Sequence, residues 1–209
     1  MKLYKFKSLR NFDHVIDILL NERLHCAVYK DLNDPFEGIF WTTFGPALVR
    51  PSVVIPKTRR MSTVEEVPLN PDCKNICSLS ASKSDVRLWS YYADNHKGVA
   101  IEIDFSGKED FISKVFYSLD LPEGSTTLLG GSSTRDILSC KTKHWEYEQE
   151  YRIIQAEKYF LIPGMIIAIY LGPRVPENHA QLLRKCCPGG LSVFNTRLDM
   201  KKIVVEAVS

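Results

Sequence analysis

The pattern that says most about the architecture of this chain is His144-Trp145-Glu146-Tyr147-Glu148-Gln149-Glu150-Tyr151-Arg152-Ile153-Ile154. Acidic residues occupy every second position before a β-branched pair. Because alternate side chains of an extended chain share one face, we expect a strand that projects Glu146, Glu148 and Glu150 together, with the arginine on the same face. Like charges at this spacing repel one another unless cations lie opposite them. We therefore predict that the row lines a cleft where carboxylates act on a ligand; the alternative is cross-strand pairing with lysine or arginine.

Length and composition are those of one ordinary folded domain. The chain has 209 residues, of which 44% are hydrophobic and 25% charged, so we expect a single domain over residues 1–209. A formal net charge of +2 argues against a protein that depends on bulk electrostatic attraction to DNA, although it is compatible with a local basic patch.

Targeting and redox features predict a cytoplasmic protein. No window reaches the roughly 18 uninterrupted apolar residues that a membrane span requires, and the basic N-terminus is not followed by the apolar core of a secretory signal. The six cysteines show no framework spacing, which favours reduced thiols. Cys73 and Cys77 lack a second pair of cysteine or histidine ligands at a usual distance, so we expect no metal cofactor.

Periodicity predicts an α+β fold with about eight short strands and three or four helices, because strands and helices do not alternate regularly. The expected strands span residues 3–6, 23–28, 76–80, 99–104, 114–117, 150–155, 166–171, 192–198 and 202–208. The expected helices lie at about residues 9–20, 86–94, 134–140 and 176–185. Prolines and basic residues predict that residues 46–71 form a surface excursion.

A set of short motifs runs through the chain: Leu3-Tyr4-Lys5-Phe6-Lys7-Ser8, Asn33-Asp34-Pro35-Phe36-Glu37, Cys77-Ser78-Leu79-Ser80, the runs Trp89–Gly98 and Trp145–Arg152, and Tyr170-Leu171-Gly172. In this order the motifs resemble a large bacterial family known only as domain of unknown function 2971. The resemblance covers residues 3–172, but the name of that family implies no activity.

The order of elements also resembles the ADP-ribosyltransferase fold. In that fold a middle strand carries a Ser-x-Ser type motif and a late strand begins with the catalytic glutamate, often as Glu-x-Glu or Gln-x-Glu. Ser78-Leu79-Ser80 and Glu148-Gln149-Glu150 match these two positions. The resemblance implies a split sheet of mainly antiparallel strands with a few flanking helices. The chain departs from the pattern at Lys5, where many members have arginine or histidine, and before Ser80, where no threonine precedes.

This second resemblance implies an enzyme that consumes NAD and transfers ADP-ribose to a macromolecular acceptor, a protein or a nucleic acid. Cleaving the bond between nicotinamide and ribose builds positive charge on the anomeric carbon. Glu150 would stabilise that charge and Glu148 would orient or deprotonate the acceptor. Aromatic rings would stack on the nicotinamide and cations would bind the phosphates. The residues expected to bind NAD are Tyr4, Lys5, Ser78, Ser80, Trp89, Tyr92 and Arg152. Small bacterial members of this fold often act as toxins or in defence against phage, a setting that the resemblance extends to this chain.

Two other functions fit the residues. A metal-dependent nuclease would gather Mg²⁺ on carboxylates that the fold must bring within reach of one ion; the candidates are Asp34, Glu102, Asp104 and Glu150. A binding module that keeps the transferase-like shape without turnover is the other possibility. Glu150 locked in a structural ion pair would favour that module.

Overall fold

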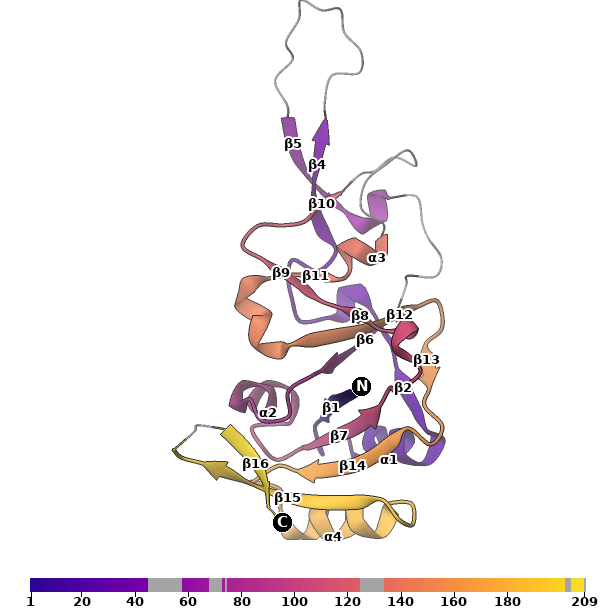
Figure 1. Cartoon of the computed structure of the whole chain (residues 1–209), viewed down its shortest axis with the longest axis vertical. Coiled ribbons are helices and arrows are strands. Elements are labelled where there is room, and N and C mark those ends of the chain that lie inside the picture. Colours follow the sequence, from indigo (N-terminus) through magenta and orange to yellow (C-terminus); the bar gives the residue numbers. More distant parts are fainter. Residues whose placement is uncertain (45–57, 68–72, 74, 125–133, 202–203, 209) are drawn as a thin grey trace, which may run out of the picture.

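A nine-stranded sheet forms the centre of the molecule (Figure 1). The computed structural model describes residues 1–44, 58–67, 73, 75–124, 134–201 and 204–208. Among the described strands, neighbours in this sheet are antiparallel except β14 and β15, which are parallel. The strand order is β16 (Val204–Val208), β15 (Ser192–Asp199), β14 (Ile166–Leu171), β7 (Val99–Asp104), β1 (Lys2–Lys7), β6 (Asn75–Ser80), β12 (Glu150–Gln155) and β8 (Ser113–Lys114), with β3 (Ala27–Val28) paired to β6.

Smaller sheets and short helices surround this sheet. The small sheets join β4 (Ile39–Phe44) to β5 (Thr58–Thr63) and β10 (Glu123–Gly124), β9 (Phe116–Ser118) to β11 (Cys140–Thr142), and β2 (Arg23–His25) to β13 (Tyr159–Leu161). The α-helices are α1 (Phe12–Asn21), α2 (Val86–Tyr92), α3 (Thr134–Ile137) and α4 (Glu177–Cys186). The 3₁₀ helices are η1 (Tyr29–Asp31), η2 (Val64–Glu66), η4 (Glu109–Phe111) and η5 (Lys143–Glu148).

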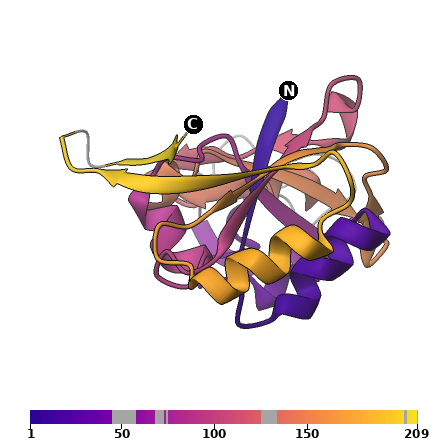
Figure 2. The ribbon, with the colours of Figure 1, turned by 90° about the horizontal axis from the view of Figure 1, so that it is seen from below.

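Apolar side chains cover both faces of the large sheet, because successive residues of a strand point to opposite faces. On one face, Leu3 of β1 belongs to a core cluster with buried residues of α1 and α4, and Figure 2 shows these two helices beneath the sheet. On the other face, Tyr4 and Phe6 of β1 pack with Leu88 and Trp89 of α2. The same strand therefore anchors two cores.

The prediction of an α+β fold is confirmed: the sheet is mainly antiparallel and the helices are few. β7, β12 and β14 begin and end at the predicted residues. Most of their β-branched residues are buried, so sequence pattern and packing agree there. Within the described ranges, no helix is long and apolar enough to cross a membrane.

Two predicted strands are each divided in the structure. Residues 23–28 form β2 and β3, which separate at Cys26 because β2 pairs with β13 while β3 pairs with β6. Residues 114–117 divide at Val115, since β8 pairs with β12 and β9 pairs with β11. In both cases a different partner on each side of one residue overrides the local pattern.

The predicted surface excursion at residues 46–71 contains a strand that the sequence pattern did not predict. Residues 58–63 form β5, which pairs along its length with the unpredicted strand β4. Thr63 and Glu66 then form a capping box at the start of η2. The rest of the excursion, residues 46–57 and 68–71, lies outside the described residues.

β1 is paired very differently along its two edges. Against β7 it is in register over its whole length, from Lys2 opposite Asp104 to Lys7 opposite Val99. Against β6 it is paired at a single position, where Tyr4 lies opposite Ser80. The sheet therefore opens between β1 and β6 after that point.

Candidate functional site

A pocket of about 290 Å³ lies where β1 and β6 separate. Lys5, Phe6 and Lys7 line it from β1, and Ser78 lines it from β6. Lys5 Nζ donates a 2.8 Å hydrogen bond to the backbone carbonyl of Ser78 and so bridges the two strands. The same pocket is lined by Glu148, Glu150, Lys141, Tyr92 and Asn33.

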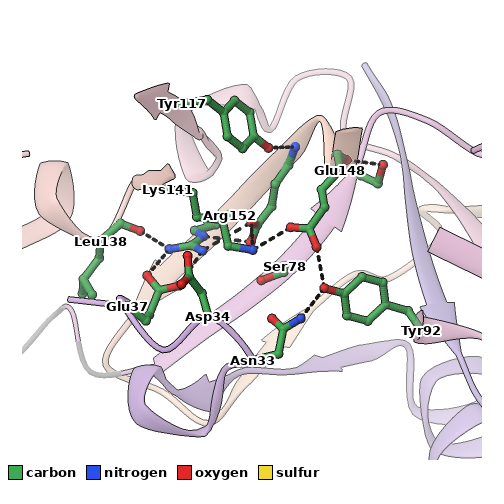
Figure 3. A network of polar contacts seen from close by, with 12 residues as sticks. Asn33, Asp34, Glu37, Ser78, Tyr92, Tyr117, Leu138, Lys141, Glu148 and Arg152 are labelled. Atoms are coloured by element: carbon green, nitrogen blue, oxygen red, sulfur yellow. Dashed lines mark hydrogen bonds and ion pairs between the residues drawn. The ribbon is translucent and has the colours of Figure 1, made fainter. Parts of the chain in front are cut away.

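Five charged side chains form a buried network beside this pocket (Figure 3). Arg152 donates to Glu37 at 2.5 and 2.8 Å and to Glu150 at 2.8 and 3.3 Å. Lys141 Nζ lies 2.6 Å from Glu148 and 2.9 Å from Glu150. The chain of contacts runs from Glu37 to Glu148, with cations and carboxylates in alternation. Three carboxylates and two cations leave one excess negative charge when all are ionised.

The two carboxylates that line the pocket have opposite pKa shifts. Burial raises the pKa of Glu150, but Arg152 and then Lys141 outweigh burial and lower it from 4.5 to about 2. Burial also raises the pKa of Glu148, and there Lys141 and Tyr92 only partly oppose the effect. Of the two, Glu150 is therefore the carboxylate that favours its ionised form, whereas Glu148 is the one that more readily takes up a proton. Such a pair is the usual arrangement for acid–base chemistry.

Tyr92 of α2 holds Glu148 at the pocket. Its hydroxyl donates to Glu148 Oε1 and accepts a 2.6 Å hydrogen bond from Asn33 Nδ2. Burial and then Glu148 raise the pKa of Tyr92, so the hydroxyl keeps its proton and continues to donate. Figure 3 shows Glu148 between Tyr92 and Lys141.

The two pocket glutamates do not lie on one strand, which corrects the prediction of an extended acidic row. Residues 143–148 form η5, and Glu146 is exposed on it. Gln149 then adopts a left-handed conformation with φ 44° before β12 begins at Glu150. Ser80 Oγ donates to the Glu148 carbonyl at 2.6 Å. This bend, rather than strand alternation, brings the two carboxylates to one lysine.

Three of the residues predicted to bind the cofactor have their polar groups taken up by contacts within the protein. Trp89 is fully buried, packs edge-on against Phe6 and donates its indole N–H to the Lys83 carbonyl, so it belongs to the core. Arg152 is 0% exposed and its donors are occupied by the buried network. Ser80 lines the pocket, but its hydroxyl is bonded within the protein, to Glu148 and Ser82. In each case a tertiary partner takes the group that a ligand would need.

The structure brings the other predicted residues to the pocket. Tyr4, Lys5, Ser78 and Tyr92 line it together with Glu148 and Glu150. The Tyr4 ring packs edge-on against Tyr170 at 6.2 Å, so it is part of the pocket wall and of the core at once. A hydrogen bond from Ser78 contributes to the low pKa of Glu150.

Sequence reasoning missed three residues of the site: Glu37, Lys141 and Asn33. Asn33 and Glu37 lie in the motif Asn33-Asp34-Pro35-Phe36-Glu37, and the acidic residue after its Asn-Asp-Pro turn was the available signal. Asp34 of the same motif accepts from the Phe36 N–H at 2.9 Å, a common role of aspartate in turns. Lys141 stands alone in β11, and no local pattern marks it as the partner of two glutamates.

The four carboxylates of the nuclease hypothesis are held by separate partners. Glu102 accepts from the Tyr170 hydroxyl and pairs with Lys2. Asp104 accepts from Ser106 and pairs with the N-terminal amine. Glu150 is held in the buried network. In the part of the chain that the structure describes, no three histidine, cysteine or acidic side chains gather as a metal site. The geometry therefore gives this hypothesis no support.

Comparison with known proteins finds no match: no family model, no curated protein and no solved structure matches the chain. The resemblances to domain of unknown function 2971 and to the ADP-ribosyltransferase fold therefore rest on the residues quoted above. The function of the chain is therefore inferred from the geometry and charges of the site itself.

Proposed function

We propose that this protein is an NAD-consuming enzyme that uses an ADP-ribosyltransferase-like split sheet to transfer ADP-ribose to a macromolecular acceptor. One observation carries the proposal. The pocket in the split between β1 and β6 is lined by two carboxylates, Glu148 and Glu150, that share one lysine and have opposite pKa shifts. Glycosidic bond cleavage commonly uses a pair of carboxylates with different roles.

Glu150 supplies the fixed negative charge. When the bond between nicotinamide and ribose breaks, its electrons leave with the nicotinamide and positive charge develops on the anomeric carbon. A carboxylate held by Arg152 and Lys141 does not have to reorient as that charge forms, and it stays ionised because its pKa is about 2. Preorganised charge of this kind is commonly the largest contribution to catalysis.

Glu148 takes the proton of the acceptor. An acceptor hydroxyl, amine or amide that attacks the sugar must lose one proton, and a carboxylate with a raised pKa is a stronger base than an ordinary one. Burial raises the pKa of Glu148, and the excess negative charge of the network favours uptake of a proton there. Lys141 and Tyr92 hold its two oxygens, which fixes the direction in which it works.

The pocket is of a size for part of a dinucleotide. A volume of about 290 Å³ is at the lower end of the range for small-molecule sites, roughly 300–1,000 Å³. It would accept one ring and its ribose beside Glu148 and Tyr92, with Leu88 as an apolar wall. The remainder of the dinucleotide would lie outside this pocket.

The direct test is release of nicotinamide from labelled NAD in the presence of candidate protein and nucleic-acid acceptors. Glu148→Gln should lower the rate by about 10²- to 10⁴-fold, the usual size of an acid–base contribution. Glutamine has one acceptor oxygen where the carboxylate has two, so one of the bonds from Lys141 and Tyr92 is lost, and the free energy of unfolding should fall by about 1.5–3 kcal/mol. Glu146→Gln is the matched control, since Glu146 is exposed on the same 3₁₀ helix, and it should keep the wild-type rate.

Two outcomes would contradict the proposal. If NAD raises the melting temperature but the wild type releases no nicotinamide with any acceptor, the chain is a binding module, the alternative that the ion pairs of Glu150 with Arg152 and Lys141 favour. If neither binding nor turnover is seen, NAD is not its substrate. Equal rates for Glu148→Gln and Glu146→Gln would remove Glu148 from the mechanism.

A further inference from the structure

A second pocket, of about 270 Å³, lies between α1, β2 and β13. Figure 1 shows these three elements together at one side of the sheet. Lys7 and His25 line both this pocket and the first one. The second pocket is therefore next to the split between β1 and β6 and shares part of its wall.

Basic side chains dominate the second pocket. Its lining contains Lys7, His14, His25 and Lys158 and a single carboxylate, Asp17. Asp17 is already neutralised: Arg23 donates to it at 3.1, 3.1 and 2.8 Å. Asn21 donates to it at 2.6 Å.

The basic residues of this pocket are not neutralised by close ion pairs, although His14 interacts with Asp17 at longer range. Across the described ranges, none of the four lies within the 4.0 Å of a carboxylate oxygen that defines an ion pair. Burial and then Lys5 lower the pKa of Lys7 to about 8. Burial and then Lys158 lower the pKa of His25. Groups that repel one another in a hollow favour the binding of an anion there.

We propose that the second pocket binds a phosphate group. A hollow lined by lysine and histidine, with its one carboxylate paired away, matches the charge and the hydrogen-bond acceptors of a phosphate ester. The source of this phosphate rests on the proposed function. If that function holds, the phosphate is that of the nucleotide whose ribose lies beside Glu148. Lys7 and His25 then contact the ligand where it passes from one pocket to the other. The other source is a separate phosphorylated ligand that uses the second pocket alone.

The experiment measures binding of inorganic pyrophosphate to the full chain by titration calorimetry, followed by competition with ADP-ribose. Pyrophosphate has no sugar, so its binding does not depend on the proposed reaction. The test variant is the double substitution His14→Gln and Lys158→Gln, because these residues line only the second pocket. Lys185→Gln, an exposed lysine on α4, is the charge-matched control.

We expect the double variant to weaken pyrophosphate binding by about 10-fold or more and Lys185→Gln to leave it unchanged. Competition by ADP-ribose identifies the nucleotide as the source. Binding without that competition identifies a separate phosphorylated ligand, and the site stands in both cases. The inference is overturned if the wild type does not bind pyrophosphate, or if the double variant binds it as tightly as the wild type. Nicotinamide release in the same preparations reports separately on the proposed function.

Discussion

The buried network has two ends that look alike in burial but differ in their surroundings. The side chains of Glu37 and Glu148 are 3% and 5% exposed, and burial raises the pKa of both. Glu37 is held by two bonds from Arg152, which also donates to the Leu138 carbonyl. Glu148 instead borders the pocket, where Lys141 and Tyr92 hold its two oxygens. Burial of a carboxylate therefore does not by itself indicate a candidate functional group, and the side open to a pocket is what distinguishes Glu148 from Glu37.

The largest expected effect on stability is at the Glu37 end of the network, which we call the closed end because it does not border the pocket; the Glu148 end is the open end. Arg152→Met would leave Glu37 and Glu150 buried without their main cation, and breaking a buried pair in this way costs about 3–5 kcal/mol. Arg10→Met is the control: Arg10 pairs with Asp94, but its side chain is 73% exposed, and exposed pairs contribute about 0–1 kcal/mol. Urea unfolding of both variants measures the difference. Similar losses for the two arginines would show that the network does not hold the fold together.

The second effect concerns acid. The pKa of Glu150 is lowered from 4.5 to about 2, so its contribution to stability is present above pH 4.5 and is lost as the pH falls from 4.5 to 2. The loss is on the order of 3 kcal/mol. The pKa values of Glu37 and Glu148 are raised. These two groups therefore stabilise the folded protein as the pH falls, and they do so at pH values above this window. Urea unfolding at a series of pH values measures this effect. Below pH 4.5, the free energy of unfolding should fall more steeply with decreasing pH in the wild type than in Glu150→Gln.

Removing the charge of Glu37 at the closed end gives a direct counterpart to Glu148→Gln. Glu37→Gln removes one charge-assisted partner of Arg152 and should destabilise the protein by about 1.5–3 kcal/mol. The folded fraction should nevertheless release nicotinamide at nearly the wild-type rate, because Glu37 does not line the pocket, whereas Glu148 does. Measured together, the two variants should lose similar stability, whereas only Glu148→Gln should lose rate. A rate loss for Glu37→Gln as large as that for Glu148→Gln would make the network a single functional unit.

The strands of this sheet could be predicted because local pattern and final packing coincide. Val99–Asp104 alternates apolar and polar residues and forms β7 over the same residues. The run Glu146 to Glu150 also alternates, yet it bends at Gln149, where φ is 44°. The alternation there reflects two different elements, and the correct convergence of Glu148 and Glu150 was reached for the wrong reason. Periodicity cannot tell a strand from a 3₁₀ helix followed by a left-handed residue.

The partners of the two glutamates could not be predicted, because they are chosen by tertiary structure. Lys141 reaches the site from β11, where no local pattern indicates it. Glu37 reaches it from the turn before β4, where the acidic residue itself was the only signal. Trp89 shows the converse: an aromatic residue that the sequence motif predicted to bind NAD belongs to the core, where Phe6 packs against it. The sequence is a guide to which elements form, whereas the ion pairs between them appear only once the sheet is assembled.

The smallest expected effect is at Tyr92, and it sharpens the role of the open end. Tyr92→Phe removes the hydroxyl that donates to Glu148 and should cost about 0.5–1.5 kcal/mol of stability. That hydrogen bond lowers the pKa of Glu148, so its loss raises the pKa further. If Glu148 acts as the base, the acidic limb of the pH–rate profile should therefore move to higher pH, while the rate at high pH stays within about 10-fold of wild type. Asn33→Ala, which keeps the tyrosine hydroxyl, should move the limb less, and an unchanged limb in Tyr92→Phe would mean that Glu148 is not the titrating group.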